Sequence, residues 1–211
     1  MNKTVLVFGI TSGETPKYLN KFTDLVDLKI IDLEILSSSE MPDSSLYSGM
    51  LFLDQPNSQN IYDSIFHNDT EFSRLKDYLQ IVLKQNRPVL ALGKGMYFLN
   101  DSLSNLENQQ YENNTISDEL IDVFISPGSK TAAIIGSGGF FKIPNTLPLS
   151  MKEFQRSNNL ITSIYQLGTG HVQGIESTLH DWVLGYQFNP FIDGPSIVRA
   201  LIDGFIERAL D

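Results

Sequence analysis

The sequence contains no cysteine and few basic residues, and both absences limit what the protein can do. Without cysteine, its 211 residues can form no disulfide, hold no thiolate metal ligand and offer no thiol nucleophile. Lysine and arginine number 15 against 25 aspartates and glutamates, which gives a formal net charge of −10. Because nucleic acids and anionic membranes attract basic surfaces, this balance predicts no nucleic-acid and no membrane partner. The lack of cysteine fits a cytoplasmic protein.

Long hydrophobic runs are also absent. The apolar run within residues 4–10 is too short for the apolar segment of a secretory signal, so we expect a buried first strand there. Nothing approaches the roughly 18 uninterrupted apolar residues of a transmembrane helix. With 41% hydrophobic and 19% charged residues, the chain is expected to fold as a single domain over residues 1–211.

Strand-like and helix-like segments alternate in the first half of the chain, which predicts parallel pairing with right-handed crossovers. The expected strands there are 4–10, 28–36, 49–53 and 88–92, and the expected helices are 16–26, 71–85 and 96–100. The second half reads as shorter strands at 120–125, 132–135, 160–166, 171–176 and 183–188, followed by a helix at 196–210. We also expect a mobile surface loop over residues 101–117 and a hairpin turn at Ser137-Gly-Gly139.

The most informative segment runs from Arg87 to Met96, where an apolar strand meets a Gly-Lys-Gly turn and a helix-like segment. A strand, a tight turn and a helix together lift one side chain out of a sheet, next to the positive end of the helix. The central residue of such an elbow often needs a positive φ. Here that residue is Gly93, so the segment is an elbow without a nucleophile.

With these residues in view, the chain resembles the class I glutamine amidotransferase-like proteins, and among them the gamma-glutamyl-GABA hydrolase type (peptidase family C26). The family elbow Pro-Val-Leu-Gly-Ile-Cys-Arg-Gly-Met-Gln is matched by Pro88–Tyr97, with Gly93 at the place of the cysteine. The family run Leu-Gly-Val-Gln-Trp-His-Pro-Glu is matched by Leu184–Phe191, with Asn189 replacing the histidine and Phe191 replacing the glutamate. The resemblance implies an α/β fold: a flavodoxin-like three-layer sandwich with a mostly parallel central sheet and a smaller antiparallel part in the second half.

Two further segments match the family in order but not in chemistry. Pro144–Ser150 stands where the family has Val-Asn-Ser-X-His-His-Gln on the substrate side, between segments 127–130 and 172–176 that resemble the flanking family strands. The family's Gly-Gly oxyanion loop corresponds to Asp54-Gln-Pro56, and Pro56 has no amide hydrogen to donate.

The replaced residues bear directly on catalysis. Amide hydrolysis by cysteine needs a thiolate, a base, and a group that orients the base. Gly93, Asn189 and Phe191 supply none of these, so we expect no catalytic residues of the family type. The expected function is binding or regulation, through a small carboxylate or gamma-glutamyl ligand, a homodimer or a partner protein. The alternative is an amide or gamma-glutamyl hydrolase with reassigned catalytic residues.

A vacated elbow has its own binding chemistry, because the amides at a helix N-terminus attract anions. The candidate ligand-binding residues are therefore Gly93, Lys94, Gly95, Gln55 and Asn189. Lys94 has a plainer interpretation as well, since relatives carry a variable and often basic residue at that position.

No cofactor or metal is expected, because His67, His171 and His180 have no metal-ligand spacing. Two interpretations are open for Phe98, Phe188 and Phe191: either they narrow the former catalytic pocket, or they simply fill the core.

Overall fold

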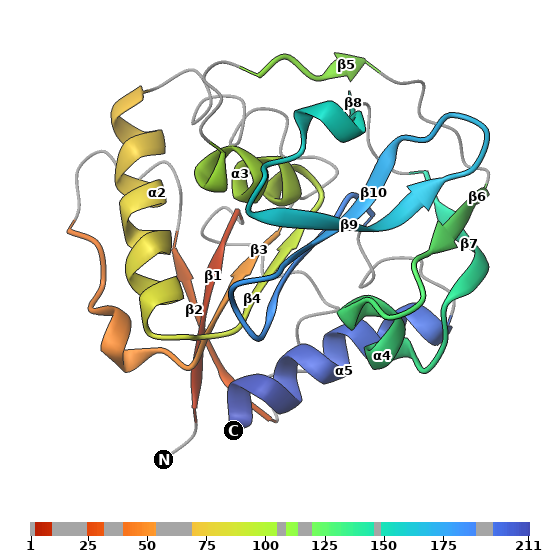
Figure 1. Ribbon diagram of the computed structural model, residues 1–211. Helices are drawn as coiled ribbons and strands as arrows, with labels where there is room; N and C mark the ends of the chain where they lie inside the picture. Colours follow the sequence, from red (N-terminus) through yellow and green to blue (C-terminus); the bar gives the residue numbers. More distant parts are fainter. Residues whose placement is uncertain are drawn as a thin grey trace.

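The computed structural model describes residues 3–9, 25–31, 40–53, 69–104, 109–113, 120–145, 149–188 and 196–211, with side chains from 199 onward in the last range. Within these residues the chain forms a nine-stranded sheet with helices on both faces (Figure 1). In sheet order the strands are β2 (Asp27–Ile31), β1 (Thr4–Phe8), β3 (Gly49–Phe52), β4 (Val89–Leu92), β11 (Val183–Tyr186), β10 (Val172–Ser177), β9 (Leu160–Gln166), β6 (Leu120–Ile125) and β7 (Gly139–Pro144). The helices are α2 (Asp69–Lys84), α3 (Lys94–Leu103), α4 (Lys130–Ile135) and α5 (Ser196–Leu210), with short 3-10 turns η3 (Ser44–Leu46) and η4 (Glu153–Gln155).

The sheet changes character at β11. The five strands from β2 to β11 pair in parallel, and β10, β9, β6 and β7 continue the sheet in antiparallel pairing. A separate two-stranded antiparallel sheet joins β5 (Glu112–Asn113) to β8 (Leu149–Ser150). The predicted α/β class, with parallel pairing first and an antiparallel part in the second half of the chain, is confirmed.

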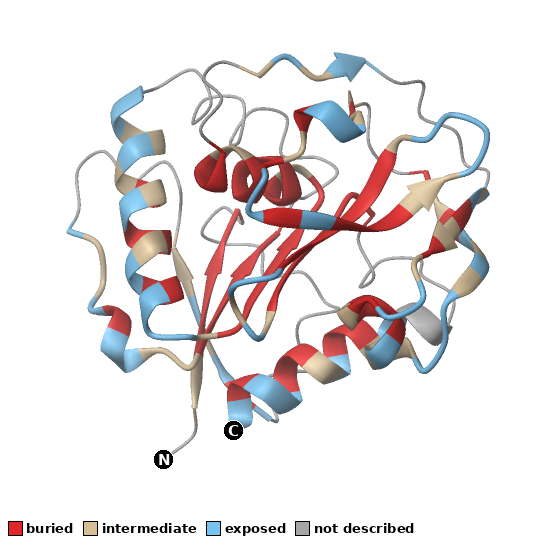
Figure 2. Cartoon of the chain, in the orientation of Figure 1, coloured by how far each residue is buried: buried red, intermediate tan, exposed pale blue. Residues whose placement is uncertain are grey.

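Two apolar layers cover the two faces of the sheet. Alternate residues of β1 point to opposite sides, Leu6 and Phe8 toward α2 and α3, and Val5 and Val7 toward α5. Figure 2 shows the resulting band of buried residues through the central strands and along α3. A strand covered on both faces needs apolar residues at every position, which explains why the parallel strands read as continuous hydrophobic runs.

The expected strand at 132–135 is wrong, because these residues belong to helix α4. Ser129 caps the helix by accepting a hydrogen bond from the Ala132 amide on its Oγ at 3.0 Å. Gly136 ends the helix in the left-handed conformation at φ 87°. These two caps favour a helix, and they outweigh the β-propensity of the adjacent residues Ile134 and Ile135. Ser137-Gly-Gly139 is consequently no hairpin turn: Ser137 and Gly138 connect α4 to β7, a strand that begins at Gly139 and that the sequence reading did not predict.

The expected surface loop at 101–117 is also wrong in part. Helix α3 continues to Leu103, and β5 lies at Glu112–Asn113, whereas 105–108 and 114–119 lie outside the described residues. Most of the expected helix 16–26 also lies outside them, and residues 25–26 form a turn and a bend before β2. The bounds predicted for β6, β9 and α5 are confirmed. None of the described helices is long and apolar enough to cross a bilayer.

Candidate functional site

The predicted elbow is present between β4 and α3. Gly93 adopts φ 63° and ψ −129°, a conformation that a glycine takes without strain and that other residues disfavour. Its amide donates to the carbonyl of Tyr186 in β11 at 2.8 Å, and its own carbonyl accepts from the Met96 amide at 3.0 Å. The turn is therefore fixed on one side to the sheet and on the other to the first turn of the helix.

The second glycine of the turn serves packing. A Cβ atom added at Gly95 would lie 2.8 Å from Cβ of Phe52 in β3, closer than real contacts allow. The missing side chain lets α3 begin directly against the neighbouring strand. We therefore assign Gly95 a packing role that holds whether or not a ligand binds at its amide.

Lys94 is the first residue of α3 and is half-buried. The amides of a first helical turn point out of the N-terminal end, where the helix dipole favours an anion. The Gly93 amide already donates to Tyr186, so it is not available to an anion at this helix end.

Gln187, which the sequence analysis did not single out, directly follows Tyr186, the residue whose carbonyl binds the Gly93 amide. Its backbone amide donates to the Gln173 carbonyl at 2.9 Å, and its side-chain amide donates to the Leu149 carbonyl at 2.5 Å. Its Oε1 atom is buried and accepts no hydrogen bond from the described residues. These contacts bring the end of β11 beside residues 149–150, two segments that the resemblance aligned with the family's histidine strand and substrate loop. Only the match of Gln187 to a family glutamine offered a cue.

A buried carboxylate lies at the start of α4. Glu176 of β10 accepts hydrogen bonds from the Lys130 amide at 2.9 Å and the Thr131 amide at 3.2 Å. The Thr131 hydroxyl also shares a 2.9 Å hydrogen bond with the Tyr186 hydroxyl. Burial raises the pKa of Tyr186, so this phenol stays neutral. The hydrogen bonds among Glu176, Thr131 and Tyr186 join α4 to β10 and β11, and the Glu176 carboxylate satisfies the first two amides of α4.

The aromatic residues near the elbow belong to two separate layers. Phe98 packs between Phe52 and Phe72, with ring centroids 5.0 Å and 5.5 Å away, on the α2 and α3 side. Phe188 packs against Tyr186 at 5.4 Å on the α5 side. Phe98 and Phe188 therefore do not line one narrowed pocket, and core filling accounts for both.

Several predicted residues lie outside the described part of the chain, namely Gln55, Pro56, His67, Asn189 and Phe191. The described residues contain no group of three potential metal ligands. Within the same residues no hydrogen bond joins the side chain of His171 or His180 to a serine, aspartate or lysine side chain.

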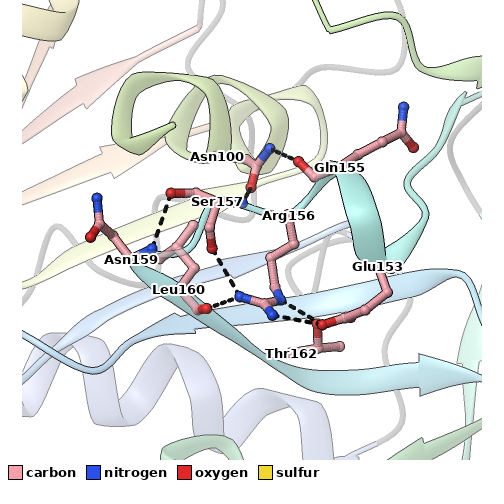
Figure 3. A network of polar contacts seen from close by, with 8 residues as sticks. All are labelled: Asn100, Glu153, Gln155, Arg156, Ser157, Asn159, Leu160 and Thr162. Carbon is pink, nitrogen blue, oxygen red and sulfur yellow. Dashed lines mark hydrogen bonds and ion pairs between the residues drawn. The ribbon is translucent and has the colours of Figure 1, made fainter. Parts of the chain in front are cut away.

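A polar network holds the opposite half of α3. Figure 3 shows Asn100 reaching from the helix to the η4 segment. Its Oδ1 accepts from the Ser157 amide at 2.8 Å and its Nδ2 donates to the Gln155 carbonyl at 2.9 Å. Next to it, the Tyr111 hydroxyl donates to Oδ1 of Asp101 at 2.5 Å. Burial raises the pKa of Asp101 to about 6, although the bonds from Tyr111 and Asn100 and the charge of Lys76 act in the opposite direction.

Comparison with solved structures identifies the fold. A protein from Thermoplasma acidophilum, described as a GMP synthase subunit on a provisional basis, superposes with a TM-score of 0.72 at 15% identity, covering 100% of this chain and 95% of that one. The glutaminase domain of the Trypanosoma brucei CTPS, solved with acivicin, gives 0.67 at 15% identity over 99% and 94% of the two chains. A glutamine amidotransferase from Thermotoga maritima gives 0.60 at 12% identity over 98% and 84%.

The chain therefore has a class I glutamine amidotransferase-like fold. No protein-family model matches the sequence, and no curated protein matches it. At identities this low the structural likeness defines the fold alone.

Proposed function

We propose that the protein is a non-catalytic member of this fold that binds a small carboxylate-bearing ligand at the elbow. The observation that carries the proposal is Gly93, which occupies the turn between β4 and α3 at φ 63° and has no side chain there. Asn189 and Phe191 stand at the aligned places of the base and its orienting group. Loss of all three groups leaves only the acceleration that binding and an oxyanion hole provide, about 10³–10⁴-fold over water.

The ligand class follows from the chemistry around the vacated position. A carboxylate at the N-terminus of α3 would accept from the amides of Lys94 and Gly95 and gain from the Lys94 charge. In this proposal, Gln55 and Asn189 contribute neutral side-chain amides. Glutamine, glutamate and gamma-glutamyl compounds carry such a carboxylate and are the ligands to test first.

Thermal unfolding with these compounds tests the binding. A ligand that binds only the native state raises Tm as its concentration exceeds its Kd. We expect Lys94→Glu to weaken binding at least about tenfold, because it places a negative charge beside the ligand. The matched control is Lys84→Glu, the same charge change at the exposed end of α2. No stabilisation by any of these compounds, or equal binding by both variants, contradicts the proposal.

Activity assays separate the proposal from its alternative, an amide or gamma-glutamyl hydrolase with reassigned catalytic residues. We expect glutamine and gamma-glutamyl amide hydrolysis to remain at the buffer rate. We expect the same of Gly93→Cys, because a thiol alone lacks the base and its orienting group. Turnover by the wild-type chain that a single substitution near the elbow abolishes would establish the hydrolase instead.

A further inference from the structure

A cavity of about 290 Å³ lies at the end of α3 that is remote from the elbow. Its walls come from α2, the last residues of α3, the loop before β9 and the turn after β10, and they include Lys76, Ser102, Asn159 and His180. The ten residues of α3 span about 15 Å at 1.5 Å per residue. The cavity is therefore separate from the position of Gly93.

Among the residues that the structure describes, those lining the cavity include a lysine and no carboxylate, although the chain carries a net charge of −10. Lys76 supplies the positive charge, and the other lining residues are neutral amides, hydroxyls, leucines and His180. Burial lowers the pKa of His180 and the nearby charge of Lys130 lowers it further, although the carboxylate of Asp181 acts in the opposite direction. The net pKa is below the ordinary 6.5, so the neutral imidazole dominates at pH 7. Such a wall favours an anion over a cation.

A second ammonium group lies directly behind this wall. The Lys130 Nζ atom donates to the carbonyl of Ser177 at 2.7 Å and to the carbonyl of His180, and both residues line the cavity. The carboxylate of Glu176 is bound to the amides that start α4. Its charge is therefore satisfied at α4, and the Lys130 ammonium adds positive charge behind Ser177 and His180.

The wall also contains a buried hydroxyl without a partner. Ser102 is 2% exposed and lines the cavity, and its Oγ makes no hydrogen bond within the described residues. A buried hydroxyl left unpaired costs about 1–3 kcal/mol, and an oxygen of a bound ligand would satisfy it once the side chain rotates toward the cavity.

The cavity lies at the C-terminal end of α3, where the helix dipole disfavours an anion, so the charge of Lys76 has to outweigh the dipole. Two donors reduce this cost because they occupy the carbonyl of Leu103. The Leu103 carbonyl accepts from the Ser157 hydroxyl at 2.5 Å and from the Asn159 side-chain amide at 2.9 Å. Figure 3 shows Ser157 and Asn159 side by side in the segment that Asn100 fixes to the helix. The wall is thus preformed, which lowers the cost of ordering it around a ligand.

We propose that this cavity is a second binding site, which takes a small ligand bearing a carboxylate or phosphate group. Lys76 pairs with the charge of that group, and the Ser102 hydroxyl donates to one of its oxygens. Asp101 does not line the cavity, but its carboxyl interacts with Lys76, so a bound anion shares the lysine charge with Asp101. The proposal stands independently of binding at the elbow, because no residue is shared between the two sites.

Titration of the full ¹⁵N-labelled chain with inorganic phosphate, followed by NMR, tests the site. We expect saturable shifts of the amides of Ser102, Ser104, Asn159 and His180, with a Kd on the order of millimolar for this minimal probe. Sodium chloride at matched ionic strength serves as the reference, and acetate distinguishes a carboxylate from a phosphate site. Shifts of Gly93–Gly95 report the elbow separately, so failure of one site leaves the other measurable.

Two variants assign the shifts to the cavity. Lys76→Gln is expected to weaken phosphate binding at least about tenfold, and Ser102→Ala about two- to tenfold, because each removes one donor. Lys84→Gln, the same loss of charge on the same helix outside the cavity, is expected to change the Kd less than about twofold. If chloride produces the same shifts, or if Lys76→Gln and Ser102→Ala both bind as tightly as wild type, the proposal is wrong.

Discussion

Gly93 and Asp101 lie at opposite ends of the same helix, and each depends on what surrounds it. Gly93 has a positive φ because the chain turns sharply there from β4 into α3. The Gly93 amide stays hydrogen-bonded to Tyr186 of β11 through this turn. Asp101 lies in the last turn of α3, where a carboxylate is poorly placed with respect to the helix dipole. Its partner Tyr111 comes from the segment that leads into β5. At this scale single residues are constrained by tertiary neighbours rather than by local propensity.

Asp101 gives stability a predictable pH dependence. Its pKa lies at about 6 in the folded chain against an ordinary 3.8, so between these values the native state binds more protons than the unfolded state. The contribution of Asp101 to the unfolding free energy therefore falls as pH rises from about 4 to 6, by up to about 3 kcal/mol. We expect Asp101→Asn to lose this component in urea titrations across that range.

The control for that measurement is Asp122→Asn, which removes an exposed carboxylate paired with Lys142 at 2.8 Å. This variant should keep the wild-type pH dependence between pH 4 and 6. If Asp101→Asn and wild type differ by the same amount at pH 4 and pH 6, the raised pKa is wrong.

At the scale of elements, α4 shows how caps and a distant partner together decide local structure. Its sequence, Lys-Thr-Ala-Ala-Ile-Ile, is short and ends in two β-branched residues. Ser129 caps one end and Gly136 the other, while Glu176 from β10 binds the first amides. The two caps are visible in the sequence, but the carboxylate is supplied by a strand 46 residues further along the chain.

Ser129→Ala tests how much the N-terminal cap of α4 contributes to the free energy of unfolding. We expect a loss of about 1 kcal/mol in unfolding free energy, because the amide of Ala132 loses its acceptor. The measurement is urea unfolding followed by circular dichroism. The control is Ser137→Ala, an exposed position after the helix, where we expect a change below about 0.5 kcal/mol. Equal effects at both positions would show that the cap contributes nothing measurable.

For the whole molecule, the continuous sheet is the feature that joins both apolar layers. Every neighbouring strand pair from β2 to β7 is hydrogen-bonded, and β1, β3, β4, β9 and β11 each contribute residues to both layers. Loss of one layer therefore exposes the sheet that the other layer needs. We expect unfolding to be cooperative across the described fold.

The single tryptophan gives a direct test of that cooperativity. Trp182 packs against Phe205 of α5, with ring centroids 5.7 Å apart, so its fluorescence reports the α5 side. We expect the fluorescence transition in urea to coincide with the far-ultraviolet circular dichroism transition. A variant with Tyr78→Trp and Trp182→Phe moves the probe to α2 and should give the same midpoint by both methods. Separate transitions would mean that the two layers unfold independently.

The sequence by itself determined the alternation of strands and helices in the first half of the chain, and the elbow with a glycine, Gly93, at its centre. These features depend on local patterns: apolar runs, a three-and-four spacing in α2, and glycines in a tight turn. The sequence reading did not find α4, the edge strand β7, the network around Asn100 or the cavity beside Ser102. Tertiary structure decided these, because their partners lie far apart in the sequence, as Asn100 does from Ser157 and Lys130 from His180. Which donors remain without a partner is fixed only when the helices and the sheet are packed together.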